Sequence, residues 1–490
     1  MKHSGFISLF ILLAAMLVNA QSVTFDKFFI DKTMRIDYYH IGDSKSEFIT
    51  LDKIYQYGTW GGSLTNLVDN FNNGKYYFKI YDAATKTLIY SKGFDSYFGE
   101  YKTSDDGLNG IKKTYHESAI IPNPKEKIIF AVETREKDNS LKEFYRTEIE
   151  PSDMYIIKDP VKDKTVKVVE SLKSGDPHVK VDVVILGEGY TASEEKKFNN
   201  DLARFTKTFF NQEPYKSNKD KFNVYGVFKA SEESGADEPD HNSFKKTILN
   251  TTFCSLGSER YLLTEDNKTM RDLASNVPYD AIYIMVNHKR YGGGGIYNLY
   301  CTYTSDNQWH EYLFLHEFGH SFAGLADEYY TSDVSYNDFY PKGVEPVEPN
   351  ITALLDKTNI KWKQYLTHGV EIPTPWEKAL FDSTDLAWQK IRREQNNKIA
   401  ELKRNKAPES EVNKLQNEYD AKDREHQKWI DQYFQKSKFH NMAGAFEGAG
   451  YASKDLYRPM LDCIMFSKGK KPFCKVCEEA IKRVINYYSE

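Results

Sequence analysis

One segment constrains the fold of this chain more than any other: HEFGHSFAGLADEYY, at residues 316–330. His316 and His320 are four positions apart, so on a helix both imidazoles project from one face. The apolar residues just before them predict that this helix is buried in a core. Two imidazoles at this spacing can bind Zn²⁺ at about 2.0–2.1 Å. Glu317 is placed to take a proton from metal-bound water. The segment therefore predicts a buried zinc-binding helix rather than an ordinary one.

A chemically active zinc site needs a third protein ligand. Gly324 can end the helix in the left-handed conformation. In metzincin-type sites the residue three positions beyond such a glycine returns to the metal, which here is Asp327. The glycine usually follows the second histidine by three positions, whereas here it follows by four. We predict Asp327 as the third ligand. The adjacent Glu328 is the alternative, and it otherwise supports the ligands or contacts substrate.

Downstream segments add candidate residues around the metal. Cys463-Ile464-Met465-Phe466 is similar to the methionine turn that lies beneath the metal in metzincins. The glycine-rich aromatic segment GAFEGAGY at 444–451 is placed between helix and turn, where such enzymes shape the substrate pocket. Tyr457 and Arg458 follow it and are candidates for substrate contact or for stabilising a developing oxyanion.

The region before the metal segment predicts a separate β domain. Segments such as TMRIDYYHI, KYYFKIYD and KIIFAVETRE alternate apolar and polar residues and are separated by turn residues. We expect an antiparallel β-sandwich over 21–157, acting as an accessory domain. A polar linker is predicted at 158–178.

The rest of the chain, 179–490, alternates buried strands with amphipathic helices and predicts a mixed α/β (α+β) domain. The glycines at 292–295 lack the Lys-Ser/Thr of a phosphate loop and favour a turn into an edge strand. The charged stretch at 376–438 predicts a projecting hairpin of two antiparallel helices. The fold class is therefore multidomain: a β-sandwich, then a zincin/metzincin-like domain with a helical-hairpin insertion.

The first residues have the pattern of a secretory signal peptide. A basic start precedes an apolar run at 6–18 and small residues at 18–20. The run is shorter than the roughly 20 residues of a membrane span. We therefore predict that residues 1–20 are a signal peptide that is cleaved off, and that the chain has no integral membrane span. The exported protein would be periplasmic, at the cell surface or extracellular. A net charge of −5 argues against nucleic-acid binding. The oligomeric state stays open.

Five cysteines in an exported chain make disulfides plausible. We expect one or two, with Cys254 paired to Cys301, and Cys463 paired to Cys474 or Cys477. The CxxC spacing of the last two also suits a zinc half-knuckle or a redox pair, but no second CxxC is present.

The combination of HEFGHSFAGLADEY, VVILGEGYT, GAFEGAGY and the tail from CIM to FCKVC resembles the secreted IgA-peptidase family of zinc metallopeptidases. The resemblance covers roughly 175–490, and the β-rich start is similar to the amino-terminal domain of Bacteroides-type members. It implies that His316, His320 and Asp327 bind Zn²⁺ and that Glu317 is the general base. It does not imply that this member cuts immunoglobulin A.

The leading hypothesis is an exported zinc endopeptidase acting on a protein or glycoprotein, with substrate added to an edge strand. A second enzyme hypothesis is a zinc exopeptidase, or an amidase acting on glycan- or peptidoglycan-linked amides. A third is a surface module that binds glycans or proteins and carries a vestigial zinc. The intact Glu317 argues against the third hypothesis.

Overall fold

Two stacked sheets form the N-terminal part of the computed structural model, which describes residues 23–160, 162–331 and 339–490. Their strand orders are β5-β1-β2-β8 and β4-β3-β6-β7. The strands are β1 Phe29–Gly42, β2 Glu47–Tyr57, β3 Tyr76–Asp82, β4 Leu88–Phe94, β5 Lys113–Pro124, β6 Ile128–Arg135, β7 Leu141–Ile149 and β8 Ile157–Lys158. Three short helices accompany them: α1 Phe25–Phe28, α2 Tyr97–Tyr101 and α3 Asp105–Leu108.

The two sheets enclose one apolar core. Met34 and Ile36 of β1 face Phe78 and Ile80 of β3, and all four side chains are buried. The alternation that predicted these strands therefore corresponds to inward and outward faces. The predicted β-rich N-terminal domain is confirmed. Its strands were expected to be antiparallel throughout, but β8 pairs with β2 in parallel.

The second part is built on a six-stranded sheet of order β13-β14-β12-β10-β11-β9. The four inner strands are mutually parallel, and both edge strands are antiparallel to their neighbours. The strands are β9 Lys167–Leu172, β10 Val181–Glu188, β11 Phe222–Phe228, β12 Ala281–Val286, β13 Gly293–Ile296 and β14 Tyr300–Thr304; a separate hairpin holds β15 Phe446–Ala449 and β16 Ala452–Arg458. The predicted mixed α/β architecture is confirmed.

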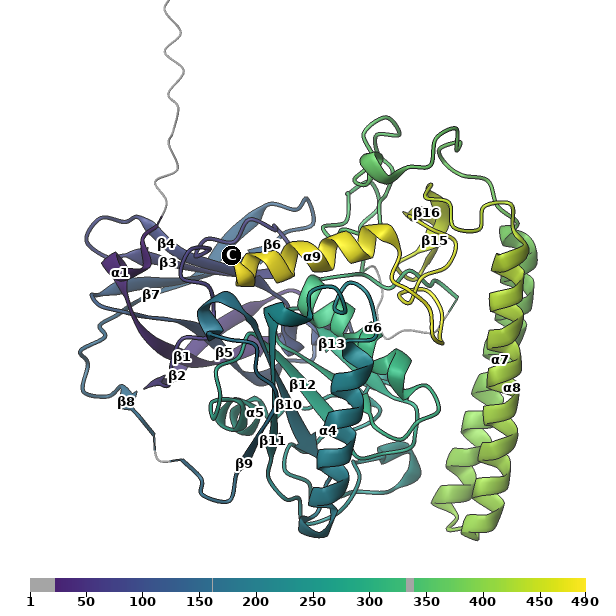
Figure 1. Ribbon diagram of the computed structural model, residues 1–490, viewed down its shortest axis with the longest axis horizontal. Coiled ribbons are helices and arrows are strands. Elements are labelled where there is room, and N and C mark those ends of the chain that lie inside the picture. Colours follow the sequence, from purple (N-terminus) through teal and green to yellow (C-terminus); the bar gives the residue numbers. More distant parts are fainter. Residues whose placement is uncertain (1–22, 161, 332–338) are drawn as a thin grey trace, which may run out of the picture.

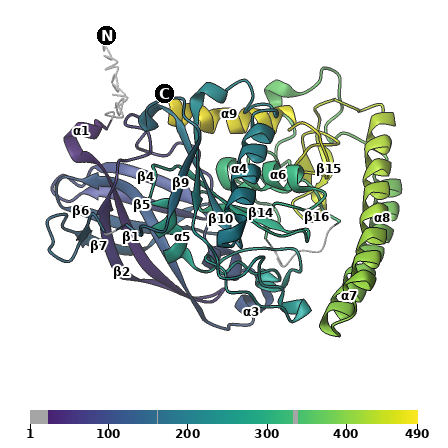
Figure 2. The same ribbon diagram turned by 60° about the horizontal axis from the view of Figure 1, so that its bottom comes forward.

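Helices cover both faces of this sheet (Figure 2). The helices are α4 Glu195–Phe209, α5 Asn267–Ala274, α6 His310–Ala323, α7 Lys378–Arg404, α8 Glu409–Lys436 and α9 Lys475–Ser489. The apolar sides of α4, α6 and α9 share one core with alternate residues of β10, while α5 packs on the opposite face. In α4 the predicted helical spacing places Phe198, Leu202, Phe205 and Phe209 in that core.

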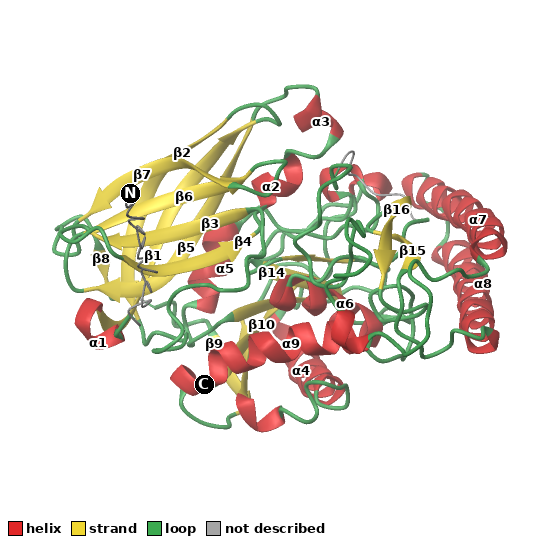
Figure 3. Cartoon of the chain, turned by 90° about the horizontal axis from the view of Figure 1, so that it is seen from above, coloured by secondary structure: helices red, strands yellow, loops and turns green. Residues whose placement is uncertain are grey.

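The boundary between the two parts differs from the predicted linker. Residues 167–172 form β9 and pair with β11, because their alternating residues complete the sheet edge. Polar contacts also join the parts directly: Arg35 Nη1 lies 2.7 Å from Asp272 Oδ1, and Asn66 Nδ2 donates to the carbonyl of Tyr487 at 2.8 Å. The two N-terminal sheets and the helices α7 and α8 lie at opposite ends of the molecule (Figure 3).

The charged stretch forms the two predicted helices, α7 and α8, which pack together through Trp388 and Tyr419. The pair is not a free projection, because its inward side carries buried polar groups. Asp423 is buried and accepts from Trp309 Nε1 at 2.6 Å, and Arg392 Nη1 pairs with Glu259 at 2.5 Å.

All five cysteines are free thiols, so the predicted disulfides are wrong. Cys301 is buried within β14, where its Sγ faces the Ile282 carbonyl at 3.8 Å, and Cys254 lies in a separate left-handed turn. The predicted signal peptide lies outside the described residues. Among the described residues no helix is both long and apolar enough to cross a membrane.

Candidate metal centre

Helix α6 carries the two histidines into the interior. It is apolar on nearly all sides, which is why it lies between the sheet and α9. Gly324 ends it with a φ of +60°, a conformation that glycine adopts without steric cost. The N–H of Gly324 donates to the His320 carbonyl at 3.0 Å. The predicted glycine turn is confirmed, and it folds the following residues back over the helix.

Three donor atoms converge after that turn. Asp327 Oδ1 lies 3.1 Å from His316 Nε2 and 3.2 Å from His320 Nε2. The two Nε2 atoms are 3.1 Å apart. A tetrahedral Zn²⁺ with bonds of about 2.0–2.1 Å holds such donors roughly 3.3 Å apart. Asp327 Oδ1 is buried and has no hydrogen-bond partner. Three lone pairs facing one point therefore fit a divalent cation.

The opposite nitrogen of each ring is held by the backbone. His316 Nδ1 lies 3.0 Å from the Ile464 carbonyl, and His320 Nδ1 lies 2.6 Å from the Leu325 carbonyl. A carbonyl only accepts, so each Nδ1 carries a proton and each Nε2 is left to bind metal. This arrangement sets the tautomer that metal binding requires.

The electrostatics of the three donors are strongly coupled. Burial alone would lower the pKa of His320, but the negative charge of Asp327 raises this pKa to about 9. Burial alone would raise the pKa of Asp327, yet the two imidazoles hold it well below its usual range. A proton and a metal cation satisfy the same lone pairs, so the cation would displace the proton.

Glu317 lies beside the donors and under the edge strand β13. Its carboxylate is buried, and burial raises its pKa. A Cβ on Gly293 would lie 2.9 Å from Glu317 Oε1, and one on Gly295 would lie 2.3 Å from the Glu317 carbonyl. The glycine run is therefore itself the edge strand, and the absence of side chains lets α6 approach β13 closely.

The methionine segment packs beneath the histidines. Met465 is fully buried, and a Cβ on Gly319, between the two ligand candidates, would lie 2.9 Å from its sulfur. The Met465 carbonyl accepts from the N–H of Glu328 at 2.8 Å. This turn therefore supports the helix and the returning chain together, as expected from its sequence.

Sequence reasoning missed three polar residues of the cleft. The Tyr451 hydroxyl donates to Asp327 Oδ2, and the Tyr451 backbone has a left-handed φ of 64°. Arg260 Nη2 donates to the Tyr329 hydroxyl at 3.1 Å, and both residues line the cleft. Tyr451 is the last residue of the segment GAFEGAGY, and Tyr329 is the next-to-last residue of the segment at 316–330. Both tyrosines therefore lie in segments that the sequence analysis singled out, but no pattern indicated where their side chains point. Arg260 had no sequence signal.

Two other candidate residues lie elsewhere. Arg458 is fully buried and donates to the Gly448 carbonyl at 2.6 Å, because β16 turns this side chain inward. Neither Arg458 nor Tyr457 is among the residues that line the cleft. The expected oxyanion or substrate role of these two residues is therefore not supported. Glu328 also points away from the histidines, toward three cysteines.

Comparison with protein-family models gave two matches. A model described as IgA Peptidase M64 matches residues 169–485, and one described as Peptidase M64 N-terminus matches residues 24–146. The comparison with curated proteins found no match. The first match spans nearly all of the six-stranded sheet, helix α6 and most of the residues that line the cleft, and the second covers most of the sandwich.

Proposed function

Given that the chain belongs to the IgA Peptidase M64 family and is therefore a peptidase, we propose that it is a zinc-dependent endopeptidase. The observation that carries this proposal is the convergence of His316 Nε2, His320 Nε2 and Asp327 Oδ1. Three nitrogen and oxygen donors suit Zn²⁺ and leave its fourth position for water, as in catalytic rather than structural zinc sites. The metzincin-like assignment rests on the same helix, glycine turn and methionine turn.

The roles of the residues follow from their positions. Bound Zn²⁺ would supply Lewis-acid polarisation of the scissile carbonyl and a water with a pKa of about 7. Glu317 accepts the proton of the attacking water and passes it to the leaving amine, a role that suits a buried carboxylate with a raised pKa. Tyr451 orients Asp327 through its hydroxyl.

The substrate would lie along the cleft beside β13. The ladder of β13 with β14 leaves the backbone groups of Gly293 and Gly295 directed away from β14. Gly293 is already paired, since its carbonyl accepts from Leu262 N at 3.2 Å and its N–H donates to Arg260 O at 3.3 Å. The Tyr297 carbonyl is paired as well, since it accepts from Asp95 N at 2.9 Å. Backbone addition of a substrate is therefore proposed at Gly295. An extended chain passing through an open cleft favours internal cleavage.

The test is digestion of a mixed-sequence peptide library by wild type and by Glu317→Ala. We expect internal cuts whose rate falls about 10²- to 10⁴-fold in the variant, while the zinc content is retained. Glu311→Ala is the matched control, because Glu311 lies on the same helix but pairs with Lys470 outside the cleft. Its rate should equal that of wild type.

Other outcomes would select the other hypotheses. Trimming confined to chain ends would indicate an exopeptidase. Release of glycan- or peptidoglycan-linked amides without internal cuts would indicate an amidase. No zinc-dependent cleavage of any substrate would favour a binding module. Export rests on the sequence of residues 1–20, and the amino-terminal sequence of the protein recovered outside the cytoplasm would test it.

A further inference from the structure

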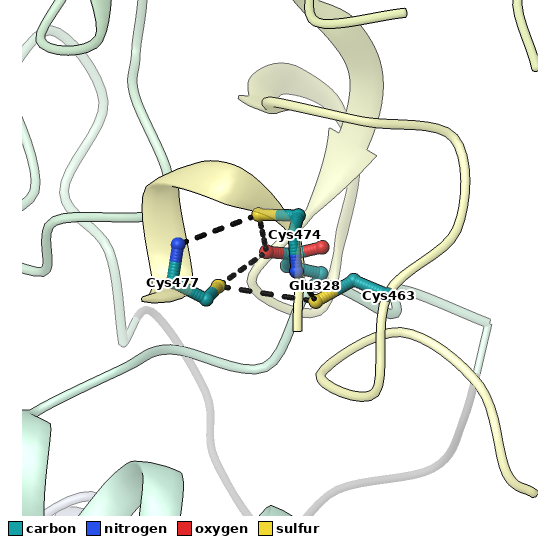
Figure 4. Close-up of side chains that lie close together, drawn as sticks. All are labelled: Glu328, Cys463, Cys474 and Cys477. Carbon is teal, nitrogen blue, oxygen red and sulfur yellow. Dashed lines mark hydrogen bonds between the residues drawn. The ribbon is translucent and has the colours of Figure 1, made fainter. Parts of the chain in front are cut away.

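A second group of donor side chains lies beside the first. Glu328, Cys463, Cys474 and Cys477 are all buried, and Figure 4 shows their side chains directed toward one another. One ligand atom from each lies within 4.8 Å of the others. The group uses none of the three candidate ligands in the cleft.

The spacing of these atoms is that of a metal site. Cys463 Sγ and Cys477 Sγ are 3.9 Å apart, and Glu328 Oε1 lies 3.3 Å from Cys477 Sγ and 3.9 Å from Cys474 Sγ. A disulfide requires a sulfur–sulfur distance of about 2.0 Å. A tetrahedral Zn²⁺ with zinc–sulfur bonds of about 2.3 Å holds two sulfurs roughly 3.8 Å apart. The observed distances match the second geometry.

The carboxylate in this group is otherwise poorly satisfied. Glu328 is fully buried; its Oε1 accepts from Asn350 Nδ2 at 3.1 Å, but its Oε2 has no hydrogen-bond partner. Thiols are weak donors, so the two that face Glu328 Oε1, Cys474 and Cys477, compensate a buried carboxylate incompletely. A cation shared by the carboxylate and the sulfurs removes this deficit.

The surroundings also suit thiolates. Cys474 is the N-cap of α9, and the N–H of Cys477 donates to Cys474 Sγ at 3.4 Å. The N–H of Cys474 donates to Cys463 Sγ at 3.2 Å. Backbone N–H groups at a helix N-terminus stabilise negative charge. Loss of the three thiol protons on metal binding is therefore electrostatically supported.

We propose that Glu328, Cys463, Cys474 and Cys477 bind a second Zn²⁺ with a structural role. Four protein ligands in a buried site leave no position for water or substrate, which distinguishes this site from the cleft. Thiolate-rich donors select zinc over magnesium or calcium.

The four proposed ligands of the second zinc come from three segments of the chain that lie next to the histidine site. Glu328 directly follows Asp327, and Cys463 precedes the carbonyl of Ile464 that holds His316. The third participant is the start of α9. One ion would thus fix the returning chain, the methionine turn and the last helix together. This proposal goes beyond the peptidase function and does not depend on it.

The test is zinc stoichiometry of the purified full chain loaded with excess Zn²⁺ and passed through gel filtration. Wild type should hold two equivalents. His316→Ala/His320→Ala should retain one, and Cys474→Ser/Cys477→Ser should retain the other. Cys254→Ser is the matched control, because this thiol lies outside the group, and it should hold two.

Cobalt replacement identifies the ligands. Sulfur-to-cobalt charge-transfer absorption should persist in the double histidine variant and vanish in the double cysteine variant. The proposal is overturned if the double histidine variant binds no zinc, or if its cobalt form lacks sulfur ligation. It is also overturned if mass spectrometry of zinc-loaded wild type shows a disulfide among the three cysteines.

If the cysteine variant does not fold, the histidine variant still decides. Titration of its thiols with a mercurial should release one equivalent of zinc into a colorimetric chelator. Release of none would refute the proposal. A peptidase that proves inactive would leave this measurement unaffected.

Discussion

Two adjacent acidic residues serve two different donor groups. Asp327 turns toward the histidines of α6 in a cleft, whereas Glu328 turns toward three cysteines in the interior. The first group has three donors and is open to the cleft on one side. The second group has four donors and is buried on all sides. The contrast shows that two consecutive residues can supply a ligand to the cleft and a ligand to a buried group that holds the same segment in place.

The backbone explains why neighbours point in opposite directions. The N–H of Glu328 donates to the Met465 carbonyl at 2.8 Å, and the Asp327 carbonyl accepts from Gly450 N at 2.9 Å. The segment is extended between two flanking chains, and successive side chains of an extended segment alternate in direction. Each site therefore constrains the other through one peptide bond.

The largest expected effect comes from exchanging the two acids for alanine separately. Asp327→Ala should empty the histidine site and abolish hydrolysis, a loss exceeding the roughly 10- to 100-fold typical of residues that only support a ligand. Glu328→Ala should keep the zinc of the histidine site and lose affinity at the cysteine group. Metal analysis and peptide hydrolysis measure both. Zinc loss from the histidine site only in Glu328→Ala would reverse the assignment.

The next effect concerns Tyr451, which orients Asp327. Tyr451→Phe removes the hydroxyl that donates to Asp327 Oδ2, and we expect activity or zinc affinity to fall about 10- to 100-fold. The ring is retained, so the packing changes little. Tyr457→Phe is the control, because this side chain does not line the cleft. Equal activities in the two variants would show that Asp327 needs no such support.

A chelator should remove zinc from the two sites at different rates. A chelator can reach an ion with an open position directly, whereas a buried four-ligand site must first open, so we expect the cleft to lose zinc at least about tenfold faster. Activity would follow the first loss, and reaction of the cysteines with a thiol reagent would follow the second. Simultaneous loss would mean that the sites open as one unit.

The features that were predicted correctly depend mostly on residues that are close together in the sequence. The His316–His320 spacing, the glycine turn at Gly324 and the strand alternation of the sandwich depend on neighbours in sequence, and the structure has the same elements. The expected third ligand, Asp327, also lies with the histidines.

The sequence did not show those features that depend on contacts between residues far apart along the chain. Whether Asp327 or Glu328 faces α6 depends on the chains that flank them, and the side to which Arg458 points depends on the twist of β16. The cysteines were expected to form disulfides because the chain is predicted to be exported. No sequence pattern indicated that Glu328 lies with three of them. Residues 167–172 were assigned to a linker because an edge strand is short and polar.

The smallest effect concerns His40, a buried histidine of β1 that belongs to neither donor group. A variant at this position separates pH effects on folding from those on metal loading. Burial alone would lower the pKa of His40, but Glu117 and Glu47, each 3.1 Å from a ring nitrogen, raise this pKa above its usual value. Their stabilisation is therefore fully present below the unfolded pKa of about 6.5. It is lost as pH rises through the raised folded value.

The same group also has an acid limit. Burial alone would raise the pKa of Glu47, but hydrogen bonds and charges from His40 and Lys102 lower this pKa to about 2. Its contribution is thus fully present above its unfolded pKa and lost toward pH 2, so both contributions are fully present only between roughly pH 4.5 and 6.5. We expect His40→Gln to lower the free energy of unfolding by about 1.5–3 kcal/mol at pH 6, and by less in alkaline buffer. Urea unfolding across pH measures this, with the exposed His440→Gln as control. Unchanged zinc content would show that the pH response of the sandwich is independent of both donor groups, and an equal loss at every pH would show that His40 is not charged in the fold.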